Sequence, residues 1–314
     1  MRVYPLTLLA LWIAGGSAAH FYSVERSIPA EVALPAGLAM LVELSLYAGL
    51  AFKTVREWAA RQPPLWIALS AAVPFLLYSL PVGVFRWPAL LALVALACTV
   101  SFWYRALPGH PLSDLAFLAV MAAGLLARVF DHIYPAPVER VDISILGQLM
   151  WIRLGIFAVL ELRRFDGIGF GFLPERREWW IGLRHYAYFM PLGVALALGL
   201  RFARFDPAGD LWWRLPLTFI GVFWVVALSE EFFFRGMLQP LLTRYWGTTA
   251  GLLAASLAFG AVHLPFREFP NWEFAALAAV AGLFYGRAFL KGQGIRAAIV
   301  THALVVTTWR TLFR

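Results

Sequence analysis

Long apolar segments follow one another along almost the whole chain, and they limit the possible folds more than any other feature. An α-helix needs about 20 apolar residues to cross the hydrocarbon core of a bilayer. Such segments lie at residues 4–22, 32–52, 64–85, 88–104, 112–130, 143–162, 185–202, 215–238, 248–264, 274–290 and 295–312 of the 314-residue sequence. The sequence therefore predicts an all-α, multi-pass membrane protein with about eleven transmembrane helices.

The composition supports this class and separates it from other classes of basic protein. Hydrophobic residues make up 61% of the chain and charged residues 14%, whereas soluble domains are nearer to half and a quarter. The net charge of +8 would suggest nucleic-acid binding in a soluble protein. Here the basic residues gather in alternate loops, which is the pattern of cytoplasmic loops. We therefore expect the lipid bilayer and no nucleic acid as a partner, a cytoplasmic N-terminus and a C-terminus on the opposite side. The composition also resembles that of a bacterial inner-membrane protein.

The longest connection between predicted spans divides the chain into two parts. Residues 166–184 combine basic side chains with Trp179 and Trp180, a mixture typical of a segment that lies among lipid headgroups. We expect residues 1–165 to form a six-helix transmembrane region, 166–184 a cytoplasmic interfacial linker, and 185–314 a C-terminal domain of five spans. Arg153 lies deep in the N-terminal region, and the sequence does not reveal its partner.

Two adjacent carboxylates interrupt the predicted span 215–238. A charged residue at the centre of a transmembrane helix costs roughly 2.5–3.5 kcal/mol on insertion scales, so such residues usually have a function. Glu231 and Arg235 are four residues apart, with the acid first, which favours an ion pair on one helix face. Glu230 lies about 100° around the helix, and its neighbours at four residues are Val226 and Phe234. The pattern predicts that Glu231 is paired and that Glu230 is free for chemistry.

Two histidines follow in later apolar segments. His263 comes four residues after Phe259, and His302 lies in the last predicted span. Either histidine alone is more often a packed core residue than a catalytic one. Together with Glu230, however, they place one carboxyl group and two imidazoles on three different apolar helices. Such a set, converging inside a helix bundle, predicts a site that activates water.

These motifs, in this order, resemble those of the CPBP intramembrane proteases, also called the Abi or CAAX prenyl protease 2-like family. The resemblance covers roughly residues 182–308. It is carried by Glu230-Glu231-x-x-x-Arg235, by Phe259-x-x-x-His263, by His302-Ala303, and by Ala281-Gly282-x-x-x-Gly286. The resemblance implies a protease core in the C-terminal five spans. It also implies a membrane-anchored protein or peptide substrate, cut near its C-terminal tail, as in CaaX processing or the processing of bacterial sorting signals.

The resemblance also implies a role for each motif residue. Glu230 corresponds to the catalytic glutamate, Glu231 to its partner and Arg235 to a structural cation. His263 corresponds to the histidine that holds and activates water, and His302 to the one that stabilises the oxyanion. We therefore expect an endopeptidase in which a glutamate and histidines activate water.

One position departs from the family pattern. Val306 stands four residues after His302, where the family usually has Asn or a similar polar residue. Loss of one oxyanion donor costs roughly 3–4 kcal/mol of transition-state stabilisation. Thr301 and Thr307 are the candidate substitutes. Val306 also favours the alternative function, a non-catalytic membrane binder such as an immunity or scaffold protein.

Two other mechanisms stay open. Glu230, His263 and His302 are residue types that bind zinc, so a metallopeptidase is the alternative mechanism. We nevertheless expect no cofactor, because Arg235 engages Glu231 and the sequence has no His-Glu-x-x-His motif. A transporter with Glu230 and His263 as a proton relay is a third possibility, although the two halves show no inverted repeat.

The predicted spans place Glu230 and His263 at different depths. Glu230 lies eight residues before the end of its span, roughly 12 Å, whereas His263 lies fifteen residues into the next span, roughly 22 Å. The two side chains then meet only if residues 237–246 re-enter the bilayer or the helices are offset. Pro240 would allow a break in the helix.

Overall fold

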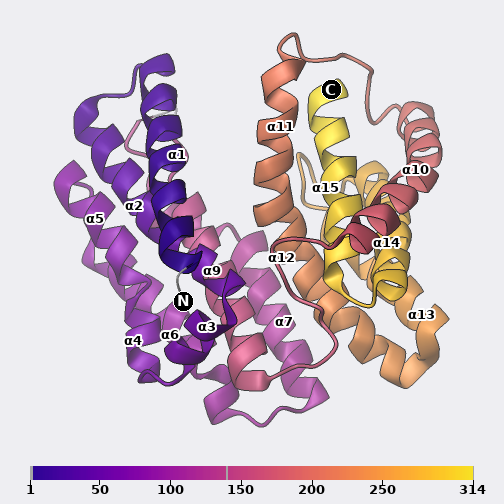
Figure 1. Ribbon diagram of the computed structural model, residues 1–314, viewed down its shortest axis with the longest axis horizontal. Coiled ribbons are helices and arrows are strands. Elements are labelled where there is room, and N and C mark those ends of the chain that lie inside the picture. The colour runs from indigo at the N-terminus through magenta and orange to yellow at the C-terminus, as the bar shows by residue number, and fades with distance from the viewer. Residues whose placement is uncertain (1–2, 139–140, 314) are drawn as a thin grey trace. The chain divides into compact units, whose positions relative to one another are not determined.

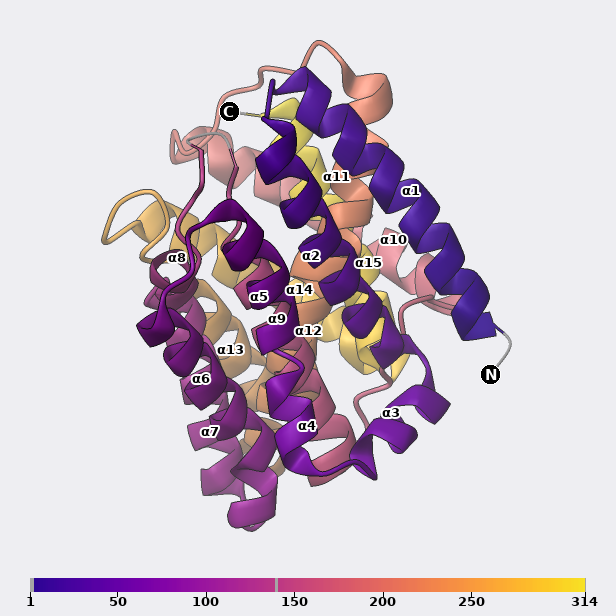
Figure 2. The same cartoon turned by 90° about the vertical axis from the view of Figure 1, so that its left-hand side faces the viewer.

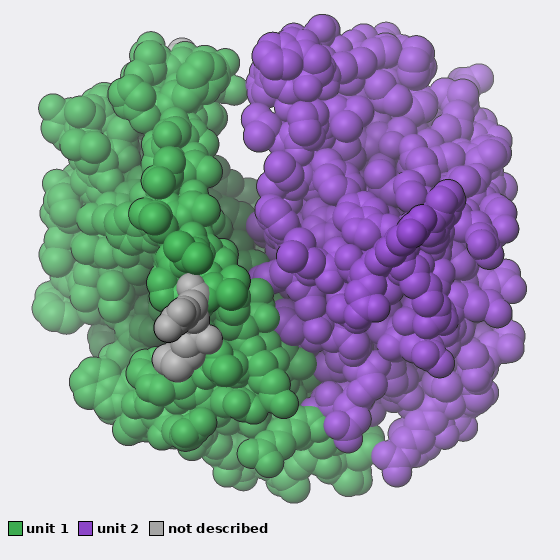
Figure 3. All heavy atoms as spheres, in the orientation of Figure 1, with its two compact units in different colours: residues 1–164 green, residues 165–314 purple. Residues whose placement is uncertain are grey.

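The computed structural model describes residues 3–138 and 141–313. The chain is 79% helical and has no strand in this described part, so the expected all-α class is confirmed. It divides into two compact units, residues 1–164 and 165–314 (Figure 3).

A single central helix organises the first unit. Nearly every residue of α9 is buried, whereas α1 buries none and packs beside α2 (Figure 2). A helix that is apolar on all sides belongs in a core, as α9 does. The helices are α1 Val3–Glu25, α2 Ala30–Ala48, α3 Lys53–Ala60, α4 Pro64–Leu69, α5 Ala72–Val82, α6 Trp87–Ala106, α7 Pro111–Leu126, α8 Val129–Ile133 and α9 Ile145–Phe157, with a 3₁₀ turn at Gly49–Ala51 and a π-helical segment at Ala158–Arg163.

Buried ion pairs cross the core of the first unit. The Arg153 guanidinium donates from Nε to Glu43 Oε1 at 2.8 Å and from Nη2 to Glu43 Oε2 at 3.3 Å. Arg163 donates to both carboxylate oxygens of Asp114, at 2.9 and 3.0 Å. Glu43, 110 residues away in the sequence, is therefore the partner of Arg153 that could not be named from the sequence.

The second unit is a helix bundle with one interrupted long helix (Figure 1). Two π-helical segments, Val222–Ala227 and Phe232–Leu238, connect α11, α12 and the start of α13. The helix α10 begins nine residues before the predicted span, because Glu175 and Glu178 form a capping box at its N-terminus. The helices are α10 Arg176–Gly199, α11 Leu211–Gly221, α12 Leu228–Glu231, α13 Gln239–Ala261, α14 Trp272–Gly292 and α15 Ile295–Leu312.

The protein is an integral membrane protein, although its helices divide differently from the eleven predicted spans. In the described part of the chain, the stretches long and apolar enough to cross a membrane are Val3–Glu25, Ala30–Ala51, Pro64–Val82, Trp87–Ala106, Ile145–Arg163, Leu211–Ala261 and Trp272–Gly292. The 51-residue stretch Leu211–Ala261 contains two predicted spans. The remaining three predicted spans lie on α7, α10 and α15, which fall below these seven in length or hydropathy.

A turn at Gly247 resolves the difference in depth between Glu230 and His263. The helix continues past Pro240, which lies two residues after the end of the π-helical segment Phe232–Leu238, and turns only at Gly247, where φ is 78°. Glu230 therefore lies 17 residues before the turn and His263 lies 16 residues after it. Each arm is about 25 Å long, so the two side chains reach the same level.

Candidate active site

A buried network fixes Glu231 between Arg235 and His302, which lie on different helical segments. Glu231 Oε1 accepts a hydrogen bond from Arg235 Nη1 at 3.1 Å and lies 2.7 Å from His302 Nδ1 on α15. Arg235 and Glu231 are fully buried, and Arg235 Nη2 also donates to the Gly282 carbonyl oxygen on α14 at 3.1 Å. The Arg235 guanidinium lies over the Phe259 ring at 4.3 Å. Glu231 therefore joins three helices and orients the His302 ring.

Glu230 is placed differently from its neighbour. Its side chain is 30% exposed, and its Oε2 atom lies 3.8 Å from His302 Nε2. That separation is too long for a direct hydrogen bond. Oε2 itself is buried and has no hydrogen-bond partner among the described residues. The sequence-based distinction between the paired Glu231 and the locally unpaired Glu230 thus agrees with the geometry.

His263 lies just beyond the end of α13 and faces the same space. Its Nδ1 lies 2.6 Å from the Phe259 carbonyl oxygen, so Nδ1 carries a proton and donates it. In the neutral ring, Nε2 is then an acceptor. Phe274 holds the ring edge-to-face, with the centroids 4.8 Å apart. The tautomer of His263 is thereby set by its own backbone.

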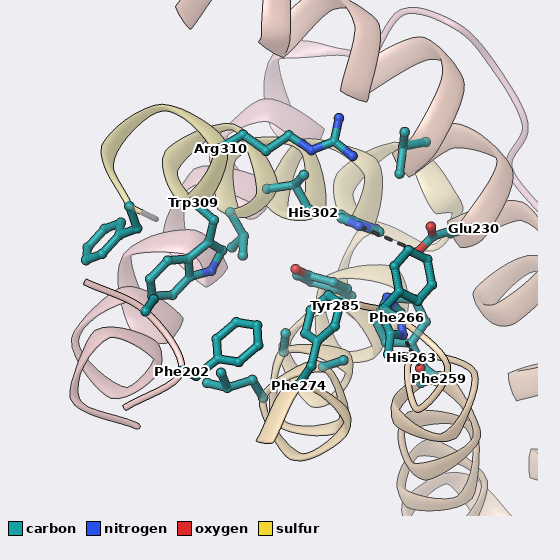
Figure 4. A pocket seen from close by; sticks show the side chains of 18 of the residues that line it. Phe202, Glu230, Phe259, His263, Phe266, Phe274, Tyr285, His302, Trp309 and Arg310 are labelled. Carbon is teal, nitrogen blue, oxygen red and sulfur yellow. Dashed lines mark hydrogen bonds and ion pairs between the residues drawn. The ribbon is translucent and has the colours of Figure 1, made fainter. Parts of the chain in front are cut away.

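Glu230, His263 and His302 line a single cavity of about 570 Å³ (Figure 4). Its other walls are mostly aromatic or aliphatic and come from α10, α14 and α15, from the π-helical segment before α12, and from residues that follow α10 and α13. They include Phe189, Phe202, Val226, Phe266, Phe274, Leu277, Trp309 and Phe313. The three polar groups that the sequence places on separate helices are therefore close together at an apolar pocket, the usual setting of a small-molecule or peptide site.

Irregular helical hydrogen bonding surrounds Glu230. The four residues of α12, Leu228–Glu231, lie between the two π-helical segments. π-Helical turns are rare and often occur at functional sites, because they change the direction in which side chains project. This local irregularity was not evident in the sequence.

Tyr285 belongs to the site and was missed by sequence reasoning. Its ring stacks on the His302 ring, with centroids 4.5 Å apart and an interplanar angle of 11°. Gly282, three residues earlier, lets α14 approach, because a Cβ there would lie 3.1 Å from Arg235 Nη2. The signal was present in the small-residue motif Ala281-Gly282-x-x-x-Gly286, which brings Tyr285 into the bundle.

The candidate substitutes for the missing polar residue are not at the cavity. Val306 lines it, on the same face of α15 as His302, but Thr301 and Thr307 do not. The Thr301 hydroxyl donates to the carbonyl oxygens of Gly182 and Ala297, both at 3.1 Å. Helical rotation explains this placement, since residues one before and five after His302 point about 100° and 140° away from it.

Glu230, His263 and His302 are residue types that can bind a metal ion. Within the described residues, no group of three or more His, Cys, Asp or Glu side chains is arranged to hold a metal ion. Glu230, His263 and His302 share a cavity, but they do not meet the ligand arrangement of a zinc site.

Comparisons with known proteins identify the C-terminal part of the chain. No curated protein and no solved structure matches the sequence. Residues 212–308 match the family model described as Rce1-like, type II CAAX prenyl endopeptidase Rce1-like. The match covers α11 to α15 up to Thr308 and includes every motif on which the resemblance rests. It confirms the resemblance for the C-terminal part of the chain and supports a peptidase of the CAAX type, embedded in a membrane.

Proposed function

We propose that the protein is an intramembrane endopeptidase in which Glu230 is the general base. The proposal rests on the position of the Glu230 carboxylate. Its buried Oε2 atom has no hydrogen-bond partner in the described part of the chain and lies 3.8 Å from His302 Nε2 at the cavity wall. A water molecule between two polar atoms at that separation can hydrogen-bond to both.

Hydrolysis then follows from the positions of the three polar groups. Glu230 takes one proton from the water, and His263 Nε2 accepts a hydrogen bond from its other O–H group. The water oxygen attacks the scissile carbonyl carbon, and the carbonyl electron pair moves onto its oxygen. The protonated His302 ring donates from Nε2 to this oxyanion. Glu230 returns its proton to the leaving nitrogen as the C–N bond breaks.

Glu231 and Arg235 act as positioning residues in this scheme. The Glu231 carboxylate accepts from His302 Nδ1, which balances the charge of the protonated ring and directs Nε2 toward the cavity. Arg235 in turn holds Glu231 and is anchored by the Gly282 carbonyl oxygen. Charge-assisted hydrogen bonds of this kind are roughly twice as strong as neutral ones.

The walls of the cavity favour a peptide substrate with apolar side chains. Phe202, Phe274, Leu277 and Trp309 surround the space next to the polar groups. We propose a membrane-anchored protein or peptide, cut near its C-terminal tail as in CaaX processing or the processing of bacterial sorting signals. The proposed location is the bacterial inner membrane with the N-terminus in the cytoplasm, so a reporter at the C-terminus should lie outside the cytoplasm. A cytoplasmic reporter signal there would contradict the orientation.

A second candidate function is that of a non-catalytic binder. It is favoured by Val306, whose side chain lines the cavity where the resemblance places a polar donor. In this case the cavity would bind a membrane-anchored tail without cutting it, as an immunity or scaffold protein would.

The test is cleavage by the full chain in proteoliposomes. Two reporters carry either a prenylated CaaX tail or a bacterial C-terminal sorting tail, and the released C-terminal fragment is measured. Cleavage by the unmutated protein, unchanged after exhaustive chelation and absent in Glu230→Gln, is the expected result. Chelator-sensitive cleavage would favour the zinc alternative. Tight binding of either reporter without cleavage would favour the binder.

A further inference from the structure

A short segment before α10 contacts both sides of the helix that carries Glu230. It has no regular secondary structure (Figure 1), and we call it the strap: Ile168-Gly169-Phe170-Gly171-Phe172. The strap lies outside residues 212–308, which match the family model, and none of its five residues lines the cavity. Its contacts are nevertheless made with the segments that orient Glu230 and His302.

One end of the strap holds the π-helical segment before α12. Trp224, in the segment Val222–Ala227, donates from Nε1 to the Phe172 carbonyl oxygen at 3.0 Å. An indole N–H donates in one fixed direction in the plane of the ring, so this bond restricts rotation of the Trp224 side chain. It therefore limits movement of the π-helical segment relative to the strap.

The rest of the strap packs on the π-helical segment after α12. The Phe170 ring lies edge-to-face on the ring of Phe232, the first residue of that segment, with the centroids 5.6 Å apart. Ile168 is buried against Gly236, where a Cβ atom would lie only 2.9 Å from Ile168 Cγ2. The strap thus contacts the irregular helix on both sides of Leu228–Glu231.

The strap is also fixed to the start of α15. The Ile295 backbone N–H donates to the Ile168 carbonyl oxygen at 2.9 Å. Gly169 has a left-handed backbone with φ of 62°, and a Cβ atom there would lie 2.5 Å from the Gly294 Cα atom. Only glycine allows both this conformation and this approach. His302 follows Ile295 by about two helical turns, so the strap joins the helix of His302 to that of Glu230.

The direction of the Glu230 side chain depends on the hydrogen bonding of the two π-helical segments. A π-helical turn bonds residue i to i+5, one residue further than an α-helical turn. Reversion of either segment to α-helical bonding would shift the register by one residue and rotate one part of the helix by about 100° relative to the other. π-Helical turns are rare, so contacts from outside the helix are needed to maintain them. The strap makes such contacts with both segments.

We propose that the strap residues Ile168, Phe170 and Phe172 are positioning residues, which hold the two π-helical segments so that Glu230 faces the cavity. They act through Trp224, Phe232 and Gly236, which are likewise absent from the cavity lining. The functional core then extends beyond residues 212–308 to include the strap. The effect of the strap on cleavage rests on the proposed endopeptidase function, whereas its effect on the order of residues 222–238 does not.

Two variants of the full-length protein, each with a matched control, test the strap. Trp224→Phe removes the indole N–H and keeps an aromatic ring, and Trp212→Phe, at a residue of α11 that is 84% exposed, is its control. Gly169→Ala forces the strap away from Gly294. Its control is Gly167→Ala, because Gly167 also has a left-handed φ, of 79°, but a Cβ atom there would meet nothing within 4 Å.

Cleavage of the reporters in proteoliposomes is the first measurement. Trp224→Phe should lower kcat about fivefold, through loss of one hydrogen bond. Gly169→Ala should lower kcat about tenfold more than Gly167→Ala does. KM should stay within about twofold, since no group that contacts the substrate is changed. The variant with both changes should lose little more than Gly169→Ala alone, because both changes act through one strap.

Hydrogen exchange in detergent is the second measurement and needs no substrate. Trp224→Phe and Gly169→Ala should speed the exchange of backbone amides in residues 222–238 and leave α14 unchanged. Local loss of protection without any cleavage by the unmutated protein would support the strap and contradict the endopeptidase.

Three results would overturn the proposal. The first is a loss of kcat that is as large in the two control variants. The second is exchange that stays unchanged in residues 222–238 or rises throughout the C-terminal unit, because the strap would then only add to general stability. The third is a raised KM at unchanged kcat, because the strap would then contribute to substrate binding and not to the position of Glu230.

Discussion

The N-terminal and the C-terminal unit both bury carboxylates beside cations, but they satisfy the oxygen atoms differently. In the first unit, both oxygens of Glu43 accept from Arg153, and both oxygens of Asp114 accept from Arg163. In the second unit, Arg235 and His302 both lie against one oxygen of Glu231. The other oxygen of Glu231 and Oε2 of Glu230 have no hydrogen-bond partner among the described residues.

This difference separates a structural pair from a reactive one. A buried charge is costly unless nearly all of its hydrogen-bonding capacity is used. Both oxygens of the Glu43 carboxylate accept hydrogen bonds from the Arg153 guanidinium, so neither oxygen is free to bind a substrate. The Glu230 carboxylate keeps an acceptor at the wall of a cavity instead. Burial alone therefore does not distinguish a functional acid in a membrane protein, and neither does an unused acceptor alone. Glu230 combines an unused acceptor with a place in the cavity lining, which Glu231 does not have.

The largest expected effect comes from replacing a buried glutamate by glutamine in each of the two units. Glu230→Gln should lower the cleavage rate by about 10²–10⁴-fold, because it removes the general base, and should hardly change thermal stability. Glu43→Gln should lower the thermal stability and hardly change the cleavage rate, since it leaves the charge of Arg153 without its carboxylate partner in the core. Fragment release in proteoliposomes and thermal unfolding in detergent measure the two effects. Equal losses of stability in both variants would contradict the comparison.

The next effect concerns the cations of the two networks. Arg235→Ala and Arg153→Ala should each destabilise the protein by about 3–5 kcal/mol, because each leaves a buried carboxylate without its cation. Arg235→Ala should in addition reduce cleavage in the fraction that stays folded, since Glu231 then no longer holds His302. Folded yield and denaturant unfolding give the stability. Normal stability of Arg235→Ala would show that the guanidinium is not needed to balance Glu231.

A smaller effect is expected from restoring a polar group beside His302. Val306→Asn should raise the cleavage rate about tenfold. This gain is smaller than the 10²–10³-fold loss of kcat that follows removal of an optimised oxyanion donor, because the new side chain is not optimally placed. Leu304→Asn, two residues earlier on α15 at a half-buried residue outside the cavity lining, is the matched control and should not raise it. A rate that is unchanged in Val306→Asn would mean that His302 alone stabilises the oxyanion.

The smallest effect is expected at Thr301. Thr301→Val keeps the shape of the side chain but removes its hydrogen bond to the Gly182 carbonyl oxygen, at a cost of about 1 kcal/mol. Cleavage should stay within about twofold, because the hydroxyl faces α10 and not the cavity. A large loss of activity at unchanged melting temperature would instead place Thr301 in the catalytic machinery.

The sequence predicted those features that depend on local spacing. Apolar segments of membrane-crossing length gave the all-α class, and the four-residue spacing of Glu231 and Arg235 indicated their ion pair. The partner of Arg153 could not be predicted, because Glu43 lies on a different helix, 110 residues away. Stacking of Tyr285 on His302 likewise depends on how α14 and α15 pack. Contacts of this kind arise from tertiary packing and leave no periodic signal in one sequence.

The end of the long helix was misjudged for a related reason. Pro240 suggested a break, since proline lacks an N–H group and crowds the preceding turn. The π-helical segment Phe232–Leu238 changes the hydrogen bonding just before it, and the helix continues. A hydropathy pattern does not reveal π-helical hydrogen bonding. The sequence therefore did not show that the helix continues past Pro240 and turns only at Gly247.

The turn at Gly247 also has an evolutionary consequence. The arms of 17 and 16 residues set the level at which Glu230 and His263 face each other. Close to the turn, the two arms pack together through Thr243 and Gly251, which lie four residues before and four residues after Gly247. An insertion of one residue in either arm would move its catalytic group by about 1.5 Å and rotate it by about 100°. Natural variation in chain length should therefore collect in the connections outside this hairpin, and homologous proteins should keep the number of residues between the glutamate and the histidine nearly constant.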